Sequence, residues 1–112
     1  MAIAFFFDNV RITLKERRRL KTYIAGLIKS NRKTLRSLNY VFCSDERLLQ
    51  INKDFLKHDY YTDIITFDLS EGEAMVGEIY ISIDRLKDNA KKMGTTLNEE
   101  LHRVIFQPWL HL

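Results

Sequence analysis

The stretch TDIITFDLSEGEAMVGEIYISI, residues 62–83, decides the fold of this 112-residue chain. Its first part, Thr62 to Asp68, is rich in β-branched residues, which favour strands. Its last part, 76–83, alternates apolar and polar positions, as a half-buried strand does. The residues on its apolar face are Gly77, Ile79, Ile81 and Ile83. Gly72 and polar neighbours between the two parts predict a turn, so the stretch predicts two strands close enough to form a hairpin.

The residues before this stretch predict two more strands and two helices. Strands are expected over Ala2 to Phe7 and Leu38 to Cys43. Thr13 and Glu16 have capping-box spacing and predict the start of the first helix, and Ser44 is expected to cap the second. The apolar stripe of the first helix is Leu20, Tyr23, Ile24, Leu27 and Ile28, and the shared face of the second is Leu48, Ile51, Asn52 and Phe55.

The residues after the stretch predict two further helices. Asp84 to Met93 is the first, with Leu86, Ala90 and Met93 facing inward, and Gly94 is expected to end it. Thr96 and Glu99 form a second capping box. The last helix carries Leu97, Leu101, Val104 and Ile105. This order predicts an α+β fold, with a mixed four-stranded sheet and four to five helices in a single domain over residues 1–112.

Composition indicates a globular, cytoplasmic protein. Hydrophobic residues make up 46% of the chain and charged residues 29%, which argues against disorder. No apolar run approaches the roughly 18 to 20 residues of a membrane span, and the apolar start lacks the basic leader of a secretory signal. The lone Cys43 excludes an internal disulfide and fits a reducing cytosol, and we expect it to be a buried, inert thiol.

Charge is unevenly distributed along the chain. Residues 1–36 contain ten Lys and Arg against two acidic residues, a net +8, whereas residues 37–112 contain eight against thirteen, a net −5. A basic first third is what phosphate contact uses. It is equally typical of a solvated helix face, so Arg17, Arg18, Arg19 and Lys21 are candidates for RNA contact with a plain structural alternative.

Two segments resemble the YbeY-type family of metal-dependent endoribonucleases that act in rRNA maturation. Residues 52–67 and 76–82 are similar to the family pattern of an Asn, an aromatic residue, Thr-Asp-Val-Leu-Ser-Phe and then Gly-Asp-Ile-x-Ile-Ser. Residues 99–112 resemble the region leading into the family signature His-Gly-x-Leu-His-Leu-x-Gly-Tyr-x-x-His. With the matching element order, the resemblance runs from about residue 1 to 106. It implies a zinc site, because two His residues four apart on a helix and a third beyond it can bind one ion and leave a position for water.

The chain departs from this signature. Gln107 stands at the first His position, and Pro108 stands at the Gly position, where it costs about 3 kcal/mol unless the helix kinks or ends. The sequence stops at Leu112, before the third His, so only His111 matches a family ligand. Leu56 and Lys57 stand where the family often has an Arg. We therefore expect no stable zinc binding and no nuclease activity from the chain as written.

The resemblance also assigns candidate site residues. Thr62, Asp63 and Lys57 are expected in the catalytic cleft, where Thr62 and Asp63 orient a bound water or a phosphate; the alternative is a side-chain-to-backbone turn that starts a strand. His58 faces RNA or is a plain loop residue. His111 is a remnant ligand or a solvated end residue. His102 is expected to have a structural role, and no function is assigned to Trp109.

The family implies a zinc-dependent, single-strand-specific endoribonuclease that acts in late 16S rRNA 3′-end maturation and ribosome quality control. We expect this chain to be an inactive form of it. The alternative is a non-catalytic module that binds RNA or the ribosome. A third possibility is that two chains share ligands such as His111 at an interface. The expected partners are rRNA or other single-stranded RNA and the ribosome, without membrane or DNA, and the chain is expected to be a monomer or weak dimer.

Overall fold

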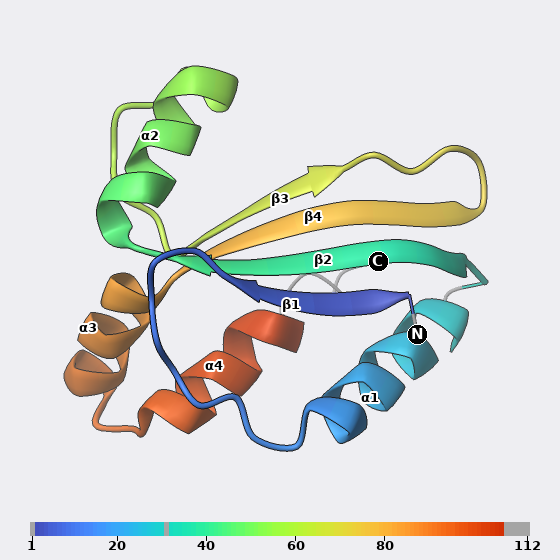
Figure 1. Cartoon of the computed structure of the whole chain (residues 1–112), viewed down its shortest axis with the longest axis horizontal. Coiled ribbons are helices and arrows are strands. Elements are labelled where there is room, and N and C mark those ends of the chain that lie inside the picture. The colour runs from blue at the N-terminus through green and yellow to red at the C-terminus, as the bar shows by residue number, and fades with distance from the viewer. Residues whose placement is uncertain (1, 31, 107–112) are drawn as a thin grey trace.

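The computed structural model describes residues 2–30 and 32–106. Its elements follow the predicted order β-α-β-α-β-β-α-α (Figure 1). They are β1 (Ile3–Phe7), α1 (Arg17–Ser30), β2 (Thr34–Cys43), α2 (Asp45–Leu56), β3 (Ile64–Asp68), β4 (Ala74–Ser82), α3 (Ile83–Met93) and α4 (Leu97–Phe106). The predicted α+β class is confirmed.

The four strands form one mixed sheet in the order β1-β2-β4-β3. The pairs β1–β2 and β2–β4 are parallel, whereas β3 runs antiparallel to β4, as the predicted hairpin requires. Parallel neighbours need long crossover connections, which here contain α1 between β1 and β2, and α2 with β3 between β2 and β4. The carboxyl ends of β2 and β4 therefore meet at one edge of the sheet, where α2 and α3 begin.

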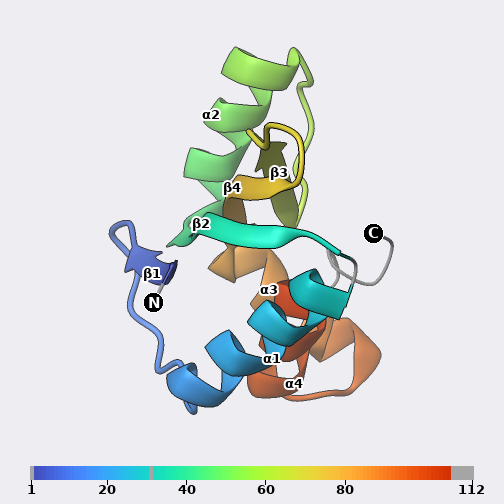
Figure 2. The same cartoon turned by 90° about the vertical axis from the view of Figure 1, so that its right-hand side faces the viewer.

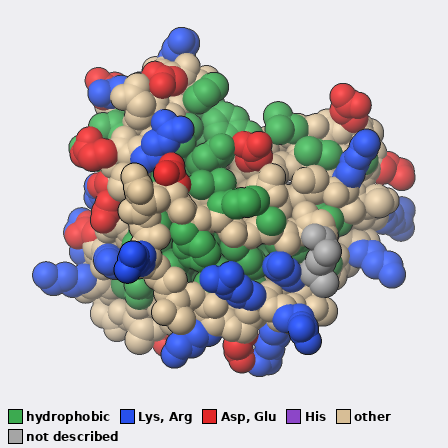
Figure 3. Space-filling view, viewed as in Figure 1, with side chains coloured by type: hydrophobic (Ala, Val, Ile, Leu, Met, Phe, Trp, Pro, Cys, Tyr) green, Lys and Arg blue, Asp and Glu red, His purple; other side chains and the backbone are tan. Residues whose placement is uncertain are grey.

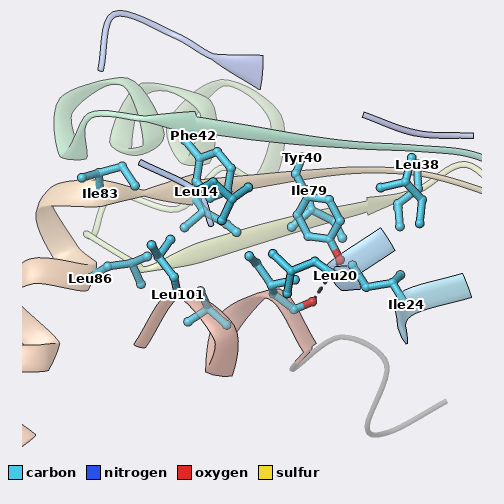
Figure 4. Packing of buried hydrophobic residues seen from close by; sticks show 14 of the residues in the cluster. Leu14, Leu20, Ile24, Leu38, Tyr40, Phe42, Ile79, Ile83, Leu86 and Leu101 are labelled. Carbon is cyan, nitrogen blue, oxygen red and sulfur yellow. Dashed lines mark hydrogen bonds between the residues drawn. The ribbon is translucent and has the colours of Figure 1, made fainter. Parts of the chain in front are cut away.

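The sheet lies between two unequal layers of helices. Figure 2 shows α2 on one face and α1, α3 and α4 on the other. The larger cluster lies on the three-helix side, where Leu38, Tyr40 and Phe42 of β2 are buried (Figure 4). The Tyr40 hydroxyl donates to the carbonyl oxygen of Ile105 at 2.9 Å and so ties α4 to the sheet. The smaller cluster lies under α2 and consists of Cys43, Leu48, Ile51 and Ile65.

Several predicted helix ends are confirmed. Ser44 accepts a hydrogen bond from the Arg47 amide at 3.1 Å and caps α2. Gly94 ends α3 with a left-handed φ of 65°. The Thr96 hydroxyl accepts from the Glu99 amide at 3.1 Å, as in a capping box, although the Glu99 carboxylate bonds to the neighbouring Thr95.

The first predicted capping box is wrong. Helix α1 begins at Arg17, and Glu16 has a left-handed φ of 56°, so Glu16 is not in its first turn. Leu14 is buried in the larger cluster. The segment before α1 therefore inserts into the core first, and the chain turns at Glu16 before the helix begins.

Other boundaries and faces also differ from the prediction. Strand β2 begins at Thr34 rather than Leu38, because it pairs with β4 from Ala74 onward. Ile83 begins α3 instead of ending β4, since the Ser82 hydroxyl accepts from the Arg85 amide and caps the helix. The side chains expected on inward faces that are instead exposed are Tyr23, Phe55 and Met93. Within residues 2–30 and 32–106, none of the helices is both long and apolar enough to span a membrane.

Candidate functional site

The loop after α2 is held to that helix by Asn52. Lys57 closes α2 in the left-handed conformation, with φ 60°, and its amide donates to the Asn52 carbonyl. The same carbonyl accepts from the His58 amide at 3.1 Å. The buried Asn52 side chain donates to the Tyr60 carbonyl at 2.9 Å. One residue therefore fixes the loop at three points.

This loop presents rings and a cation to solvent. The His58 ring stacks on Tyr60 with centroids 5.1 Å apart, and the Tyr60 hydroxyl lies 2.8 Å from His58 Nδ1. Lys57, His58 and Tyr60 are exposed. Lys57 and His58 are thus accessible to a ligand. Sequence reasoning missed Asn52 and Tyr60 as contributors, although an amide on an otherwise apolar helix face is a signal for Asn52.

Asp63 points away from that loop, toward the three-helix side. Its carbonyl accepts from the Ser82 amide at 3.0 Å, and its carboxylate lies 3.4 Å from Asn89 Nδ2 and 3.4 Å from Arg103 Nη2. Thr62 is half-buried beside it. Within the described residues, no hydrogen bond or ion pair joins Asp63 to Lys57 or His58. The catalytic role of Thr62, Asp63 and Lys57 therefore stays a prediction.

Glu100, on α4, is joined to Asp63 through the side chain of Arg103. It is 1% exposed, and its carboxylate accepts from Arg103 at 2.5 and 2.8 Å. Hydrogen bonding to Arg103 lowers the pKa of Glu100 and outweighs the opposite effect of burial. The Arg103 guanidinium thus links Glu100 to Asp63, so the start of β3 is fixed against α4.

A polar network joins the carboxyl ends of β2 and β4. Asp45 accepts from the Ser82 hydroxyl at 3.0 Å and pairs with Arg85 at 2.7 Å. The Arg85 guanidinium lies 5.3 Å from the centre of the Tyr61 ring, and the Tyr61 hydroxyl donates to Glu46 at 2.9 Å. That hydrogen bond raises the pKa of Tyr61. The network fixes the base of loop 57–63, and no sequence motif had indicated it.

The predicted basic residues lie at the start of α1, and two of them contact the edge strand β1. The Arg17 guanidinium lies 5.2 Å from the centre of the Phe7 ring, and Lys21 Nζ lies 5.7 Å from that of Phe5. Arg18 and Arg19 are exposed. Figure 3 shows Lys and Arg side chains along the lower part of the molecule, where α1 lies. The arrangement suits contact with phosphates, and this role also stays a prediction.

The described residues do not form a metal site on their own. In residues 2–30 and 32–106, no three His, Cys, Asp or Glu side chains are grouped so that they can hold an ion. The predicted remnant ligand His111 and the substituted positions Gln107 and Pro108 lie outside the described residues, as does Trp109. A site with three such ligands therefore requires at least one residue from outside these ranges or from a second chain.

Comparison with known proteins identifies relatives over nearly the whole chain. The model of the family "Endoribonuclease YbeY" matches residues 7–112. Proteins of that name from Cytophaga hutchinsonii and Parabacteroides distasonis are 50% and 40% identical, over 98% and 100% of this chain and 78% and 79% of their own length. The solution structure of TM1509 from Thermotoga maritima is similar with a TM-score of 0.65 and 25% identity, over 98% of this chain and 71% of that one. The chain therefore belongs to the endoribonuclease YbeY family.

Proposed function

We propose that this chain binds single-stranded RNA in the cytoplasm and acts in late 16S rRNA 3′-end maturation and ribosome quality control, but does not cleave RNA by itself. The observation that carries the proposal is the pair Gln107 and Pro108, which stand where the family pattern has His and Gly. An amide is a poor zinc ligand beside imidazole. The described residues offer no cluster that replaces the missing ligand.

The RNA part of the proposal is supported by two surfaces. The first is the basic start of α1, with Arg17, Arg18, Arg19 and Lys21. The second is the loop that presents Lys57 and His58. Lys and Arg at phosphates supply most sequence-independent affinity for nucleic acids. The relatives are named endoribonucleases, which agrees with an RNA substrate.

The test measures zinc per chain after a chelator wash and zinc re-addition, together with cleavage of single-stranded RNA. We expect zinc near zero and no cleavage above the blank for the unchanged chain. The double variant Gln107→His/Pro108→Gly restores two family positions and should retain more zinc. Gln50→His is the matched control, because it adds a histidine at an exposed position of α2. Metal-dependent cleavage by the unchanged chain would contradict the proposal, whether or not it survives His111→Ala.

The second candidate function is a non-catalytic module that binds RNA or the ribosome. It is favoured by the basic residues of α1, because contacts of Lys and Arg with phosphates need no metal. RNA affinity that does not change with chelators but falls with salt supports it.

A third arrangement, in which a metal joins two chains through ligands such as His111, is tested by sedimentation in the presence and absence of zinc. A monomer that does not change with zinc excludes that arrangement.

A further inference from the structure

A pocket of about 300 Å³ lies between α1 and α4, on the basic side of the molecule. We call it the α1–α4 pocket. The residues that line it are Glu16, Arg19, Leu20, Tyr23, His102 and Phe106. It combines aromatic walls, a cation and an imidazole, and of these groups only Arg19 has a role above.

Aromatic rings form the walls of the α1–α4 pocket. The Tyr23 and Phe106 rings have centroids 4.9 Å apart at 57°, and His102 lies 6.2 Å from Phe106 at 59°. Tyr23 is 58% exposed, although it lies on the helix stripe that otherwise faces the core. It also lines a second, shallower hollow together with Arg18 and Arg19. An exposed ring between two hollows is accessible to a planar ligand.

One polar atom of His102 lacks a protein partner. In the part of the chain that the structure describes, Nε2 of His102 is buried and makes no hydrogen bond, so a ligand in the pocket reaches it only when the His102 side chain turns. Buried polar atoms are nearly always paired, so an exception needs a physical reason. An imidazole nitrogen can donate or accept according to its tautomer. The edges of nucleobases carry both donors and acceptors and can satisfy it either way.

Charge at the mouth of the pocket favours an anionic strand over an apolar peptide. Arg18 and Arg19 are exposed beside it, within a segment of net charge +8. Arg19 pairs with Glu16 at 3.5 Å, but both side chains are largely exposed, and such surface pairs contribute little. Arg19 can therefore turn to a phosphate at small cost.

We propose that the α1–α4 pocket binds one unpaired base of single-stranded RNA, which stacks on the exposed Tyr23 ring while the flanking phosphates contact Arg18 and Arg19. The His102 side chain turns so that its Nε2 hydrogen-bonds to the bound base. This inference rests on the proposed RNA-binding function and names a base-binding site within it.

The experiment compares two labelled eight-nucleotide RNAs by fluorescence anisotropy at fixed salt, one with bases and one abasic throughout. His102→Phe keeps a ring but removes the nitrogen, and Tyr23→Leu removes the stacking ring. Stacking contributes about 1–3 kcal/mol per base, so Tyr23→Leu should bind the base-containing RNA at least fivefold more weakly. His102→Phe loses one hydrogen bond and should bind it about two- to tenfold more weakly. Affinity for the abasic RNA should stay the same, and Tyr23→Phe should bind like the unchanged chain.

Phe55→Leu is the matched control, since Phe55 is an exposed aromatic on α2, across the sheet from the pocket. Circular dichroism establishes that each variant is folded. If the unchanged chain binds RNA but His102→Phe and Tyr23→Leu bind it equally well, or lose affinity equally for the abasic RNA, the base site is wrong and RNA binding stands. If the unchanged chain binds neither RNA, the proposed function and the base site both fail.

Discussion

At the scale of single residues, Cys43 illustrates how surroundings set chemistry. Its side chain is fully buried beneath α2, and its sulfur lies 3.6 Å from the Ile81 carbonyl oxygen. Burial raises the pKa of the thiol from 9.0 to about 12, and the carboxylate of Asp8 adds to the shift. Because the thiolate is the reactive form, the folded protein should protect this cysteine from modification.

We expect Cys43 to react slowly with a disulfide reagent at pH 8 in the native protein and rapidly in urea. The unfolded thiol ionises near pH 9 while the folded thiol keeps its proton until about pH 12. Between pH 9 and about pH 12 the unfolded state therefore binds fewer protons than the folded state. The contribution of Cys43 to the free energy of unfolding is thus fully present below pH 9 and decreases as the pH rises toward 12. Urea titrations of the unchanged chain and of Cys43→Ala measure this share as a difference. An identical alkaline slope in both proteins would contradict the prediction.

Residue-scale predictions succeed where a local pattern decides the outcome. The burial of Cys43 follows from the apolar alternation of its strand and is confirmed. Glu100 is different, because nothing in its helix pattern indicates that a carboxylate is buried there. Its position depends on Arg103 and on Asp63, which is far away in sequence. The same long-range dependence hid the pocket formed by Tyr23 and His102, since each comes from a different helix.

At the scale of elements, helix ends were predictable wherever the cap is local. Ser44 and Gly94 cap their helices through groups within a few residues, and both were identified from the sequence. The start of α1 was not, because the burial of Leu14 decides the path of the chain ahead of Glu16. Strand β2 was predicted too short for the same reason, since its first residues depend on pairing with β4.

Two glycines should respond to alanine with opposite signs. Gly94 has φ 65° and open space around its Cα, so Gly94→Ala meets no clash but forces alanine into the left-handed region. This should lower the unfolding free energy by about 1–2 kcal/mol. Gly26 lies inside α1, also with open space, and Gly26→Ala should raise it by about 1 kcal/mol. Urea unfolding of both variants tests the pair, and a loss of stability in Gly26→Ala would contradict the assignment of a regular helix there.

At the scale of the whole molecule, the two layers of helices differ in their functional potential. The three-helix side carries α1 with its arginines and the α1–α4 pocket. On the opposite side, hydrophobic side chains gather in the hollow between α2 and the β3–β4 hairpin (Figure 3). The sequence predicted the elements and the hairpin, but neither the order of strands nor the distribution of helices over the two faces. Both follow from packing between distant segments.

RNA binding should depend on salt through the α1 arginines. Single-stranded nucleic acid gives a slope of log affinity against log salt of about −0.7 per neutralised phosphate. Arg18→Ser and Arg19→Ser should each weaken binding and make the slope shallower by about that amount. Lys91→Ser, an exposed cation of α3, is the control and should leave the slope unchanged. Fluorescence anisotropy titrations at salt concentrations from about 50 to 200 mM measure this slope. An RNA affinity that does not change over this range would exclude α1 as the RNA surface.

The network of Asp45, Ser82 and Arg85 has a consequence for the order of folding. The Asp84 carboxylate accepts from the Asp45 amide at 2.8 Å, so each of α2 and α3 supplies a partner to the first turn of the other. Neither helix start is complete until β2 and β4, about 40 residues apart, lie side by side. Such long loops are costly to close and slow to form. We therefore expect the first turns of both helices to become complete only when the central parallel pair has formed.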